Sequence, residues 1–306
     1  MKKEDKMEIP KLKDDDRVLE SLVSYISKSE SLESEKLIPV FKTNDFCLYN
    51  ADCLAVMSRF PDNYVDMTFA DPPYLLTNNG FTCHAGRMVS VNKGKWDKSK
   101  GFEEDLKFHE TWISECKRIL KPEGTIWISG TLHSIYQTGY LLQKLDFHLL
   151  NDIAWFKPNA APNLSCTVFA HSHETILWAR KDKKSRHTFN YKAMKEGYFP
   201  EDKMKVPDKQ MRSVWSITTP SKSEKIFGKH NTQKPLNLLK RIIVASTNEN
   251  DIILDPFNGG GTTGIACQLI GGRKYIGIDF EKESIDLTLK RYNHLKSQSI
   301  IFDEAI

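Results

Sequence analysis

Apolar residues follow two different spacings along most of the chain, and the two spacings alternate. Short continuous apolar runs predict buried strands, whereas apolar residues that recur every three or four positions predict helices. The predicted strands cover residues 46–50, 65–70, 125–129, 149–156, 175–179, 252–255 and 275–279, and the predicted helices cover residues 53–60, 106–120, 132–145, 236–246, 262–269 and 282–296. This alternation favours an α/β fold, doubly wound, with a mostly parallel sheet that helices cover on both faces.

Two segments do not follow this pattern. Residues 1–41 are rich in Lys, Asp, Glu and Ser, and only residues 18–26 have the apolar spacing of a short amphipathic helix. Residues 181–228 contain glycine and three prolines and predict irregular structure. The pattern thus predicts an N-terminal extension and an irregular insert outside the α/β core.

The irregular insert also concentrates positive charge. Residues 181–229 contain 13 Lys or Arg and six Asp or Glu, a net charge of +7, whereas the whole chain carries +4. A segment of this kind indicates a polyanionic partner, and Lys181, Lys183 and Lys184 are candidate phosphate contacts. The plain alternative is a solvated, lysine-rich surface.

Composition excludes several other classes of protein. No apolar run approaches the ~20 residues of a bilayer-spanning helix, and the N-terminus lacks the apolar stretch of a signal peptide, so we expect a cytoplasmic protein with no membrane contact. The six cysteines form no CxxC pair, which argues against a disulfide framework. Cys166, His171 and His173 are the nearest approach to a metal cluster, but a second ligand group is missing and we predict no metal.

A glycine-rich turn follows the predicted strand 252–255. The run from Asp255 through Phe257, Gly259, Gly260 and Gly261 to Thr262 joins this strand to a helix, and Asp279 ends the next strand. Glycines let a ligand approach the backbone, and an acid at the next strand tip can hold ribose hydroxyls. The glycine spacing also matches the nicotinamide-dinucleotide fingerprint, so an oxidoreductase stays an alternative at this point.

A second motif, Asp71-Pro72-Pro73-Tyr74, follows the predicted strand 65–70. Ligands of open α/β sheets bind at the carboxyl ends of the strands, and prolines leave carbonyl acceptors free because they have no N–H. An ordinary turn is the alternative reading of these residues. Next to a cofactor-type glycine loop, however, the motif favours a substrate site.

The chemistry of that motif suits an exocyclic amino group. The amino nitrogen of adenine is a poor nucleophile because its lone pair is delocalised into the ring. The Asp71 carboxylate and the Pro72 carbonyl could each accept one N–H, which favours a pyramidal nitrogen whose lone pair points at a methyl donor. Tyr74 offers an aromatic face for the base, and such stacking contributes ~1–3 kcal/mol.

Together these motifs resemble the amino-group DNA methyltransferases of the β arrangement, in which the Asp-Pro-Pro-Tyr motif comes first and the glycine loop last. The resemblance runs from about Asn50 to the final helix and includes the runs 50–53, 71–74, 120–124, 229–235, 255–264 and 275–279. Gly260 departs from it, since the family commonly has serine there. The resemblance implies a circularly rearranged Rossmann-like methyltransferase fold, with an N-terminal extension (1–41), a catalytic half (42–180), a target-recognition region (181–228) and a cofactor-binding half (229–306).

The same resemblance implies S-adenosylmethionine as cofactor and assigns the site. The flipped adenine is held by Asp71, Pro72, Pro73 and Tyr74, and the cofactor is bound by Asp52, Thr232, Lys234, Asp255, Phe257, Gly259, Gly261, Thr262 and Asp279. Asp52 is expected at the cofactor adenine, and Thr232 and Lys234 at its amino-acid end. Lys234 has a structural alternative, an ion pair with a carboxylate.

A closer resemblance concerns the DNA. Residues 78–80, 89–97 and 161–166 are similar to the second methyltransferase of GATC restriction-modification systems, enzymes that methylate the adenine of GATC and accept single-stranded as well as duplex DNA. This implies a cognate restriction endonuclease, and the family implies that homodimers are common. The polar loop 76–97 carries Arg87 and Lys93 as candidate DNA contacts, with Phe81 and Trp96 as candidate stacking residues. A disordered lid is the alternative for this loop.

Several alternatives remain at this point. A nicotinamide oxidoreductase would share the glycine loop, and an RNA or cytosine-amino methyltransferase would share the chemistry. An adenine methyltransferase with another recognition site would share every motif. A catalytically silent DNA-binding subunit belongs to a different class, but the intact Asp71 and glycine loop argue against it.

Overall fold

The computed structural model describes residues 37–74, 81–84, 87–90, 99–228 and 230–303, with backbone alone for 81–84, 87–90 and 299–303. Contacts divide the chain into two compact units, Met1–Ile38 and Pro39–Ile306, and all the elements described here belong to the second. The helix expected at residues 18–26 and most of the loop 76–97 lie outside the described residues.

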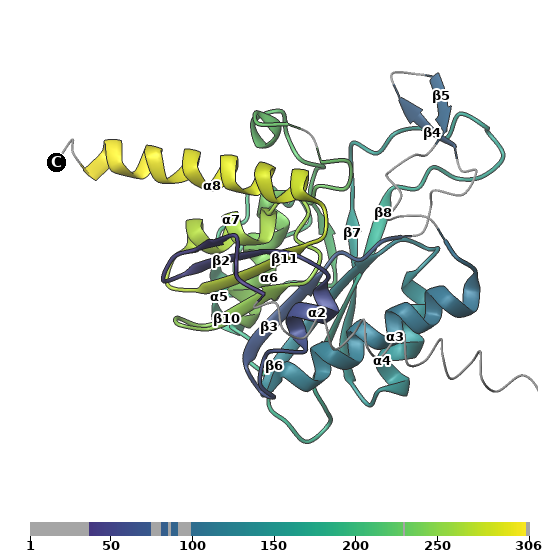
Figure 1. Ribbon diagram of the computed structural model, residues 1–306. Coiled ribbons are helices and arrows are strands. Elements are labelled where there is room, and N and C mark those ends of the chain that lie inside the picture. The colour runs from purple at the N-terminus through teal and green to yellow at the C-terminus, as the bar shows by residue number, and fades with distance from the viewer. Residues whose placement is uncertain (1–36, 75–80, 85–86, 91–98, 229, 304–306) are drawn as a thin grey trace, which may run out of the picture. The chain divides into compact units, whose positions relative to one another are not determined.

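Within the described residues, a nine-stranded sheet forms the centre of the second unit (Figure 1). In spatial order its strands are β1 (Phe41–Lys42), β2 (Phe46–Asn50), β11 (Lys274–Asp279), β10 (Ile252–Asp255), β3 (Val65–Ala70), β6 (Leu120–Gly130), β8 (His173–Arg180), β7 (His148–Phe156) and β9 (Val214–Ser216). The five strands from β2 to β6 are parallel, β8 and β7 continue the sheet antiparallel, and β9 is parallel to β7. A separate antiparallel hairpin pairs β4 (Phe81–His84) with β5 (Arg87–Ser90).

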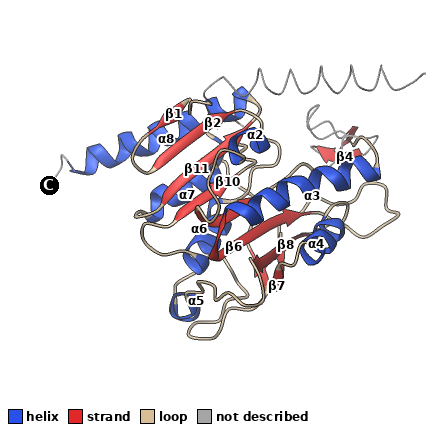
Figure 2. Cartoon of the chain, turned by 60° about the horizontal axis from the view of Figure 1, so that its bottom comes forward, coloured by secondary structure: helices blue, strands red, loops and turns tan. Residues whose placement is uncertain are grey.

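Helices cover both faces of the sheet, as the pattern of apolar residues predicted. On one face α3 (Phe102–Ile119) contacts both α2 (Cys53–Met57) and α4 (Ile135–Lys144). Figure 2 shows α3 and α4 in front of the sheet. On the other face α7 (Thr262–Ile270) lies between α6 (Leu236–Ser246) and α8 (Lys282–Asp303), and the short α5 (Tyr191–Glu196) packs on α6. The prediction of a doubly wound α/β fold is confirmed.

The strands are continuous apolar runs because the sheet is buried on both faces. Met67 and Phe69 in β3 and Ile253 and Leu254 in β10 are at most 2% exposed. Each buried apolar side chain of this size contributes roughly 1.5–3 kcal/mol, so these runs are the main reason the sheet forms.

One predicted boundary between a helix and a strand differs in the structure. The run Pro122–Gly124 was expected to separate a helix from a strand, yet β6 extends across it. Its pairing with β3 jumps from Val65 opposite Leu120 to Met67 opposite Thr125, which is a bulge. A proline is tolerated there because the bulge interrupts the ladder of hydrogen bonds.

The order of the strands creates a crevice between β10 and β3. From β3 the chain goes on to β6 on one side, whereas from β10 it goes on to β11 on the other. The connections therefore diverge at the carboxyl ends of two adjacent parallel strands, which is where ligands bind in doubly wound folds. Asp71 follows β3 and Asp255 ends β10, so both acids lie at this crevice.

The irregular insert packs as part of the same unit. Its strand β9 joins the sheet beside β7, and its Asp202 forms an ion pair with the fully buried Arg241 of α6, with a distance of 2.6 Å from Oδ2 to Nη1. The division of the chain into four parts stays a prediction. No helix in the described part of the chain is long and apolar enough to cross a membrane.

Candidate active site

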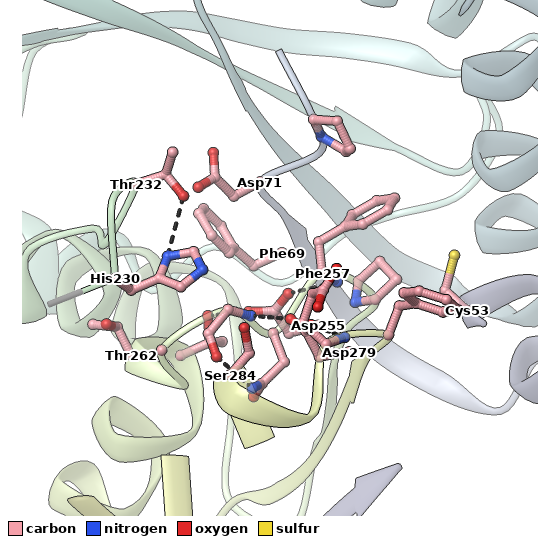
Figure 3. Close-up of a pocket in the computed structure, with 18 of the residues that line it drawn as sticks. Cys53, Phe69, Asp71, His230, Thr232, Asp255, Phe257, Thr262, Asp279 and Ser284 are labelled. Atoms are coloured by element: carbon pink, nitrogen blue, oxygen red, sulfur yellow. Dashed lines mark hydrogen bonds between the residues drawn. The ribbon is translucent and has the colours of Figure 1, made fainter. Parts of the chain in front are cut away.

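A first cavity opens at the carboxyl ends of the parallel strands. Figure 3 shows Asp71 and Thr232 on one side of it and Asp279 and Ser284 on the opposite side. Of the nine residues predicted to bind the cofactor, eight line this cavity: Asp52, Thr232, Lys234, Asp255, Phe257, Gly259, Thr262 and Asp279. The structure thus brings together residues up to 227 positions apart in the sequence, although their cofactor contacts stay predictions.

The glycine turn shapes the floor of the cavity. Gly259 has a φ of +50°, and its N–H donates to the Asp279 carboxylate at 2.6 Å. Gly261 does not line the cavity but precedes α7 with a φ of +71°, and a Cβ there would lie 2.4 Å from Thr288 Cγ2. Backbone conformation and close packing therefore require glycine at position 261.

Two acids at the strand tips are ionised less readily than usual. Burial raises the pKa of Asp255 to about 7, although the hydrogen bonds that it accepts from Thr263 and the Phe257 N–H lower that pKa. Burial likewise raises the pKa of Asp279 to about 6, against the N–H groups of Glu281 and Gly259. A ligand that offers hydroxyl groups or positive charge to these carboxylates would favour their ionised forms.

Asp52 lines the cavity and also begins a helix. Its Oδ1 accepts hydrogen bonds from the N–H groups of Leu54 and Ala55, at 2.9 and 3.1 Å, and so caps α2. Capping fixes the side chain at the rim of the cavity, because an aspartate before a helix satisfies donors that otherwise have no partner.

The Asp71–Tyr74 turn carries a buried hydrogen-bonded group. Tyr74 Oη donates to Asp71 Oδ1 at 2.5 Å, and Lys234 Nζ lies 2.5 Å from Asp71 Oδ2. Burial alone would lower the pKa of Lys234, but Asp71 and Glu174 outweigh it and raise that pKa. Lys234 therefore forms the ion pair that was its structural alternative. Its ammonium also lies 5.2 Å from the centre of the Tyr74 ring, and Tyr74 is 4% exposed.

A second cavity adjoins the first on the other side of this turn. It is lined by Tyr74 and by two residues that the sequence did not single out, Lys157 and Glu174, and it shares Thr232 and Lys234 with the first cavity. Glu174 Oε2 lies 3.2 Å from Tyr74 Oη, whose single proton is donated to Asp71, and Oε1 accepts from Lys157 Nζ at 2.5 Å. The Asp71–Tyr74 turn, the predicted catalytic turn, thus stands between two cavities.

Two further residues that line the cavities were not predicted from the sequence. His230 lines both cavities, and its Nδ1 lies 3.2 Å from Thr232 Oγ1. Phe280 lines the first cavity and is 73% exposed. His230 lies within the matching run 229–235, and Phe280 directly follows the strand-tip Asp279, so their neighbours were the available signal.

The predicted DNA contacts after β8 lie away from these cavities. Because β8 runs antiparallel to β6, it ends at the opposite edge of the sheet, and Lys181 to Lys184 follow that end. Lys181 Nζ donates to Asn63 Oδ1 at 2.7 Å and to the Leu120 carbonyl at 2.5 Å, which are contacts within the protein. This position does not favour contact with DNA at the catalytic turn.

The other predicted DNA contacts are not located in the same way. Arg87 lies in β5, where the backbone alone is described, and Lys93 lies outside the described residues. No group of three or more His, Cys, Asp or Glu side chains in the described ranges could hold a metal ion.

Fold and site together define a class of protein. Carboxylates at strand tips, a glycine turn and aromatic side chains suit a nucleoside cofactor, and a second cavity meets the first at a buried acid. This arrangement suits an enzyme that binds a nucleoside cofactor and a second substrate in separate places.

Comparisons with known proteins identify the family. Residues 65–290 match the N6/N4 methyltransferase family, described as DNA methylase. The chain is 51% identical to the type II methyltransferase M2.LlaDCHI of Lactococcus lactis subsp. cremoris, a match covering 83% of this chain and 92% of that one. It is 50% identical to the type II methyltransferase M2.DpnII of Streptococcus pneumoniae, covering 83% and 91%.

Solved structures agree with this assignment. The M1.HpyAVI–SAM complex is 29% identical, covers 81% of this chain and 99% of its own, and has a TM-score of 0.58. The cytosine-N4-specific PvuII DNA methyltransferase, at 17% identity, has a TM-score of 0.65 over 83% and 89% of the two chains, which shows a shared fold.

The chain belongs to the N6/N4 DNA methyltransferase family and is an S-adenosylmethionine-dependent DNA adenine methyltransferase. The oxidoreductase alternative is therefore wrong. The lining of the first cavity fits the cofactor, because its carboxylates would accept hydrogen bonds from ribose hydroxyls and Gly259 has no side chain to fill the space beside His230. When bound, S-adenosylmethionine supplies a methyl group carried on a cationic sulfur.

Proposed function

We propose that the chain methylates the N6 nitrogen of adenine in GATC and that the target base enters the second cavity. The observation that carries this is the position of the catalytic turn. Asp71 lines the first cavity, whereas Tyr74, hydrogen-bonded to it, lines the second. A base in the second cavity would therefore present its amino group to the side of Asp71 that faces the cofactor.

Each residue of the Asp71–Tyr74 turn has its own role in the proposed reaction. The Asp71 carboxylate and the Pro72 carbonyl accept the two N–H groups of the amino nitrogen, so that its lone pair is free to attack. As the nitrogen gains the methyl group it becomes positively charged, and the negative charge of Asp71 stabilises it. The base has to leave the duplex to reach the cavity, at a cost of a few kcal/mol.

The recognition sequence rests on resemblance. The relatives at about half identity are type II methyltransferases, and the runs 78–80, 89–97 and 161–166 resemble the GATC enzymes. Single-stranded DNA fits the same proposal, since an unpaired base is less costly to present. We also propose that the protein lies in the cytoplasm, forms a homodimer and acts alongside a cognate restriction endonuclease.

Methyl transfer onto matched oligonucleotides tests the proposal. Tritiated cofactor is supplied with strands containing GATC, GTAC or no adenine, each single-stranded and duplex. We expect label in GATC alone, in both forms, with chromatography of the nucleosides showing N6-methyladenine. Label that ignores the base order would overturn GATC, and label in duplex alone would overturn the single-strand proposal.

A catalytic variant tests the site in the same assay. Asp71→Ala should lose nearly all turnover and retain cofactor binding, because Asp71 acts on the amino nitrogen and the glycine turn is separate. Asp152→Ala, on the exposed side of β7, is the control that removes a carboxylate from the same sheet. Equal losses of cofactor affinity and turnover in Asp71→Ala would make Asp71 a structural residue instead.

A further inference from the structure

Glu174 is a buried carboxylate at the catalytic edge of the sheet. It is the second residue of β8, which pairs antiparallel with β6 so that Thr175 lies opposite Gly130. The start of β8 therefore reaches the edge where β6 ends, beside the catalytic turn. The Glu174 side chain is 12% exposed, and such burial is costly for a carboxylate without partners.

The partners of Glu174 come from four other parts of the chain. Lys157, just after β7, donates to Oε1 at 2.5 Å. Oε2 accepts from Ser129 Oγ at 3.3 Å, and it lies 3.2 Å from Tyr74 Oη and 3.6 Å from Lys234 Nζ. Burial alone would raise the pKa of Glu174, but Lys234 and Lys157 outweigh it and bring that pKa to about 2. Glu174 is therefore ionised at neutral pH.

The charges of this cluster balance. Lys157 and Lys234 carry two positive charges, and Asp71 and Glu174 carry two negative ones. The Lys234 ammonium lies between the two carboxylates, 2.5 Å from that of Asp71 and 3.6 Å from that of Glu174. Without Glu174 the cluster would carry a net positive charge, and Asp71 would be the sole counter-ion of two lysines.

This excess positive charge would slow the reaction. The amino nitrogen forms a bond to the methyl carbon while the bond from that carbon to sulfur breaks, and the nitrogen is positively charged until its extra proton passes to water. An Asp71 neutralised by lysine stabilises this charge less, and an excess buried cation repels it.

We propose that Glu174, held by Lys157, is a positioning residue for methyl transfer. Glu174 shares the Lys234 ammonium with Asp71, and so it preserves the negative charge of Asp71 for the amino group. This inference rests on the proposed role of Asp71. Glu174 acts through Lys234 and Tyr74 and need not touch the substrate. The neutral amide of Glu174→Gln keeps its shape and removes its charge.

The test is a charge cycle of Glu174→Gln, Lys157→Met and the double variant. Glu174→Gln should slow single-turnover methyl transfer about tenfold or more, with unchanged cofactor affinity. The double variant removes one charge of each sign and should recover at least about fivefold of that loss. Asp152→Asn, exposed on β7, removes one carboxylate from the same sheet and should transfer at the full rate.

The pH profile separates this role from a merely structural one. In Glu174→Gln the ammonium of Lys157 has lost its carboxylate partner, so the rate should recover at high pH, where the ammonium is neutralised. The other charged or titratable groups around Glu174 are Tyr74, Asp71 and Lys234, and Lys225 and His230 line the same cavity. All of them remain in the double variant, which should show no such recovery.

Two results would overturn the proposal. One is Glu174→Gln with the wild-type rate and pH profile. The other is an equal loss in the single and double variants with no recovery at high pH, together with an equal drop in thermal unfolding temperature, which would indicate packing alone. Glu174→Asp, which keeps the charge, should retain more activity than Glu174→Gln. An inactive Asp71→Ala beside an unaffected Glu174→Gln would leave the proposed function intact and reject only this inference.

Discussion

Tyr74 Oη donates a hydrogen bond of 2.5 Å to Asp71 Oδ1, and so joins the two ends of the catalytic turn. Burial, together with the charges of Asp71 and Glu174, raises the pKa of Tyr74 well above its ordinary range, so the phenol keeps its proton at neutral pH. Lys234 holds the other oxygen of Asp71. The carboxylate is thus fixed from two sides and retains lone pairs for an amino group.

Tyr74→Phe should slow methyl transfer and leave cofactor binding unchanged. The ring remains for stacking, but the carboxylate of Asp71 loses one of its two fixed contacts. We expect a single-turnover rate about tenfold lower, the effect of removing one hydrogen bond to a charged group. Tyr136→Phe, on α4 and 76% exposed, is the matched control and should behave as wild type. A wild-type rate for Tyr74→Phe would show that the ring alone matters.

Cofactor affinity should rise with pH between about pH 5 and 7. Burial raises the pKa of Asp279 to about 6, so the carboxyl is partly protonated in this range. Ribose hydroxyls donate best to the ionised form, so binding releases a proton and strengthens as pH rises through that pKa, then becomes constant above it. Calorimetry in buffers of different ionisation heat measures both affinity and proton release.

The matched variant for this prediction is Asp279→Asn. It keeps an acceptor for the Gly259 N–H but cannot titrate, so its affinity should be about tenfold weaker at pH 7 and nearly independent of pH. A pH dependence that survives in Asp279→Asn would assign the titration to another group, and Asp255, with a pKa of about 7, is the next candidate.

Gly261→Ala should destabilise the protein more than Gly271→Ala. Both glycines have positive φ, +71° and +75°, but Gly261 has a ψ of 22°, where alanine costs roughly 1–2 kcal/mol, and Gly271 has a ψ of 167°, where it costs roughly 1–3 kcal/mol. The added methyl group at 261 would lie 2.4 Å from Thr288, whereas nothing lies within 4 Å at 271. The clash should cost about 1–3 kcal/mol more. Urea unfolding measures both values, and equal losses would show that Thr288 moves aside.

The parallel half of the fold and its two motifs could be predicted from the sequence for a physical reason. Strands buried on both faces are continuous apolar runs, and β3 and β10 begin and end where those runs do. Turn residues mark the motifs, because Asp71-Pro72-Pro73-Tyr74 and the glycine turn follow those strands directly. The two-residue β1 and the three-residue β9 were missed because so short a strand has no periodicity.

Glu174 and Lys157 could not be found in the same way. Glu174 becomes part of the site because β8 runs antiparallel to β6, which brings its start to the edge where β6 ends, and Lys157 follows the end of β7, which lies next to β8 at the same edge. An apolar run does not encode its direction in a sheet. The same uncertainty explains why Lys181, Lys183 and Lys184 were expected near DNA although β8 carries them to the opposite edge.

Strand direction also indicates which lysines of the basic insert face the DNA. The strand β9 is parallel to β7, so the residues after Ser216 lie at the catalytic edge, where Thr219, Pro220 and Lys225 line the second cavity. Lys222 is exposed in the same segment. Phosphates of DNA whose base occupies that cavity would therefore lie near Lys222 rather than near Lys183.

Lys222→Ala should weaken the salt dependence of DNA binding, and Lys183→Ala should not. Each variant removes one exposed positive charge from the same insert, so the comparison isolates position from net charge. A lost phosphate contact flattens the slope of log affinity against log salt by about 0.9 on duplex DNA and about 0.7 on single strands. Fluorescence anisotropy across a salt series, with the double variants Lys222→Ala/Lys225→Ala and Lys183→Ala/Lys184→Ala, measures the slopes. The reverse order of effects would move the DNA to the edge where β8 ends, and equal slopes in all four variants would restore the solvated-surface interpretation of the insert.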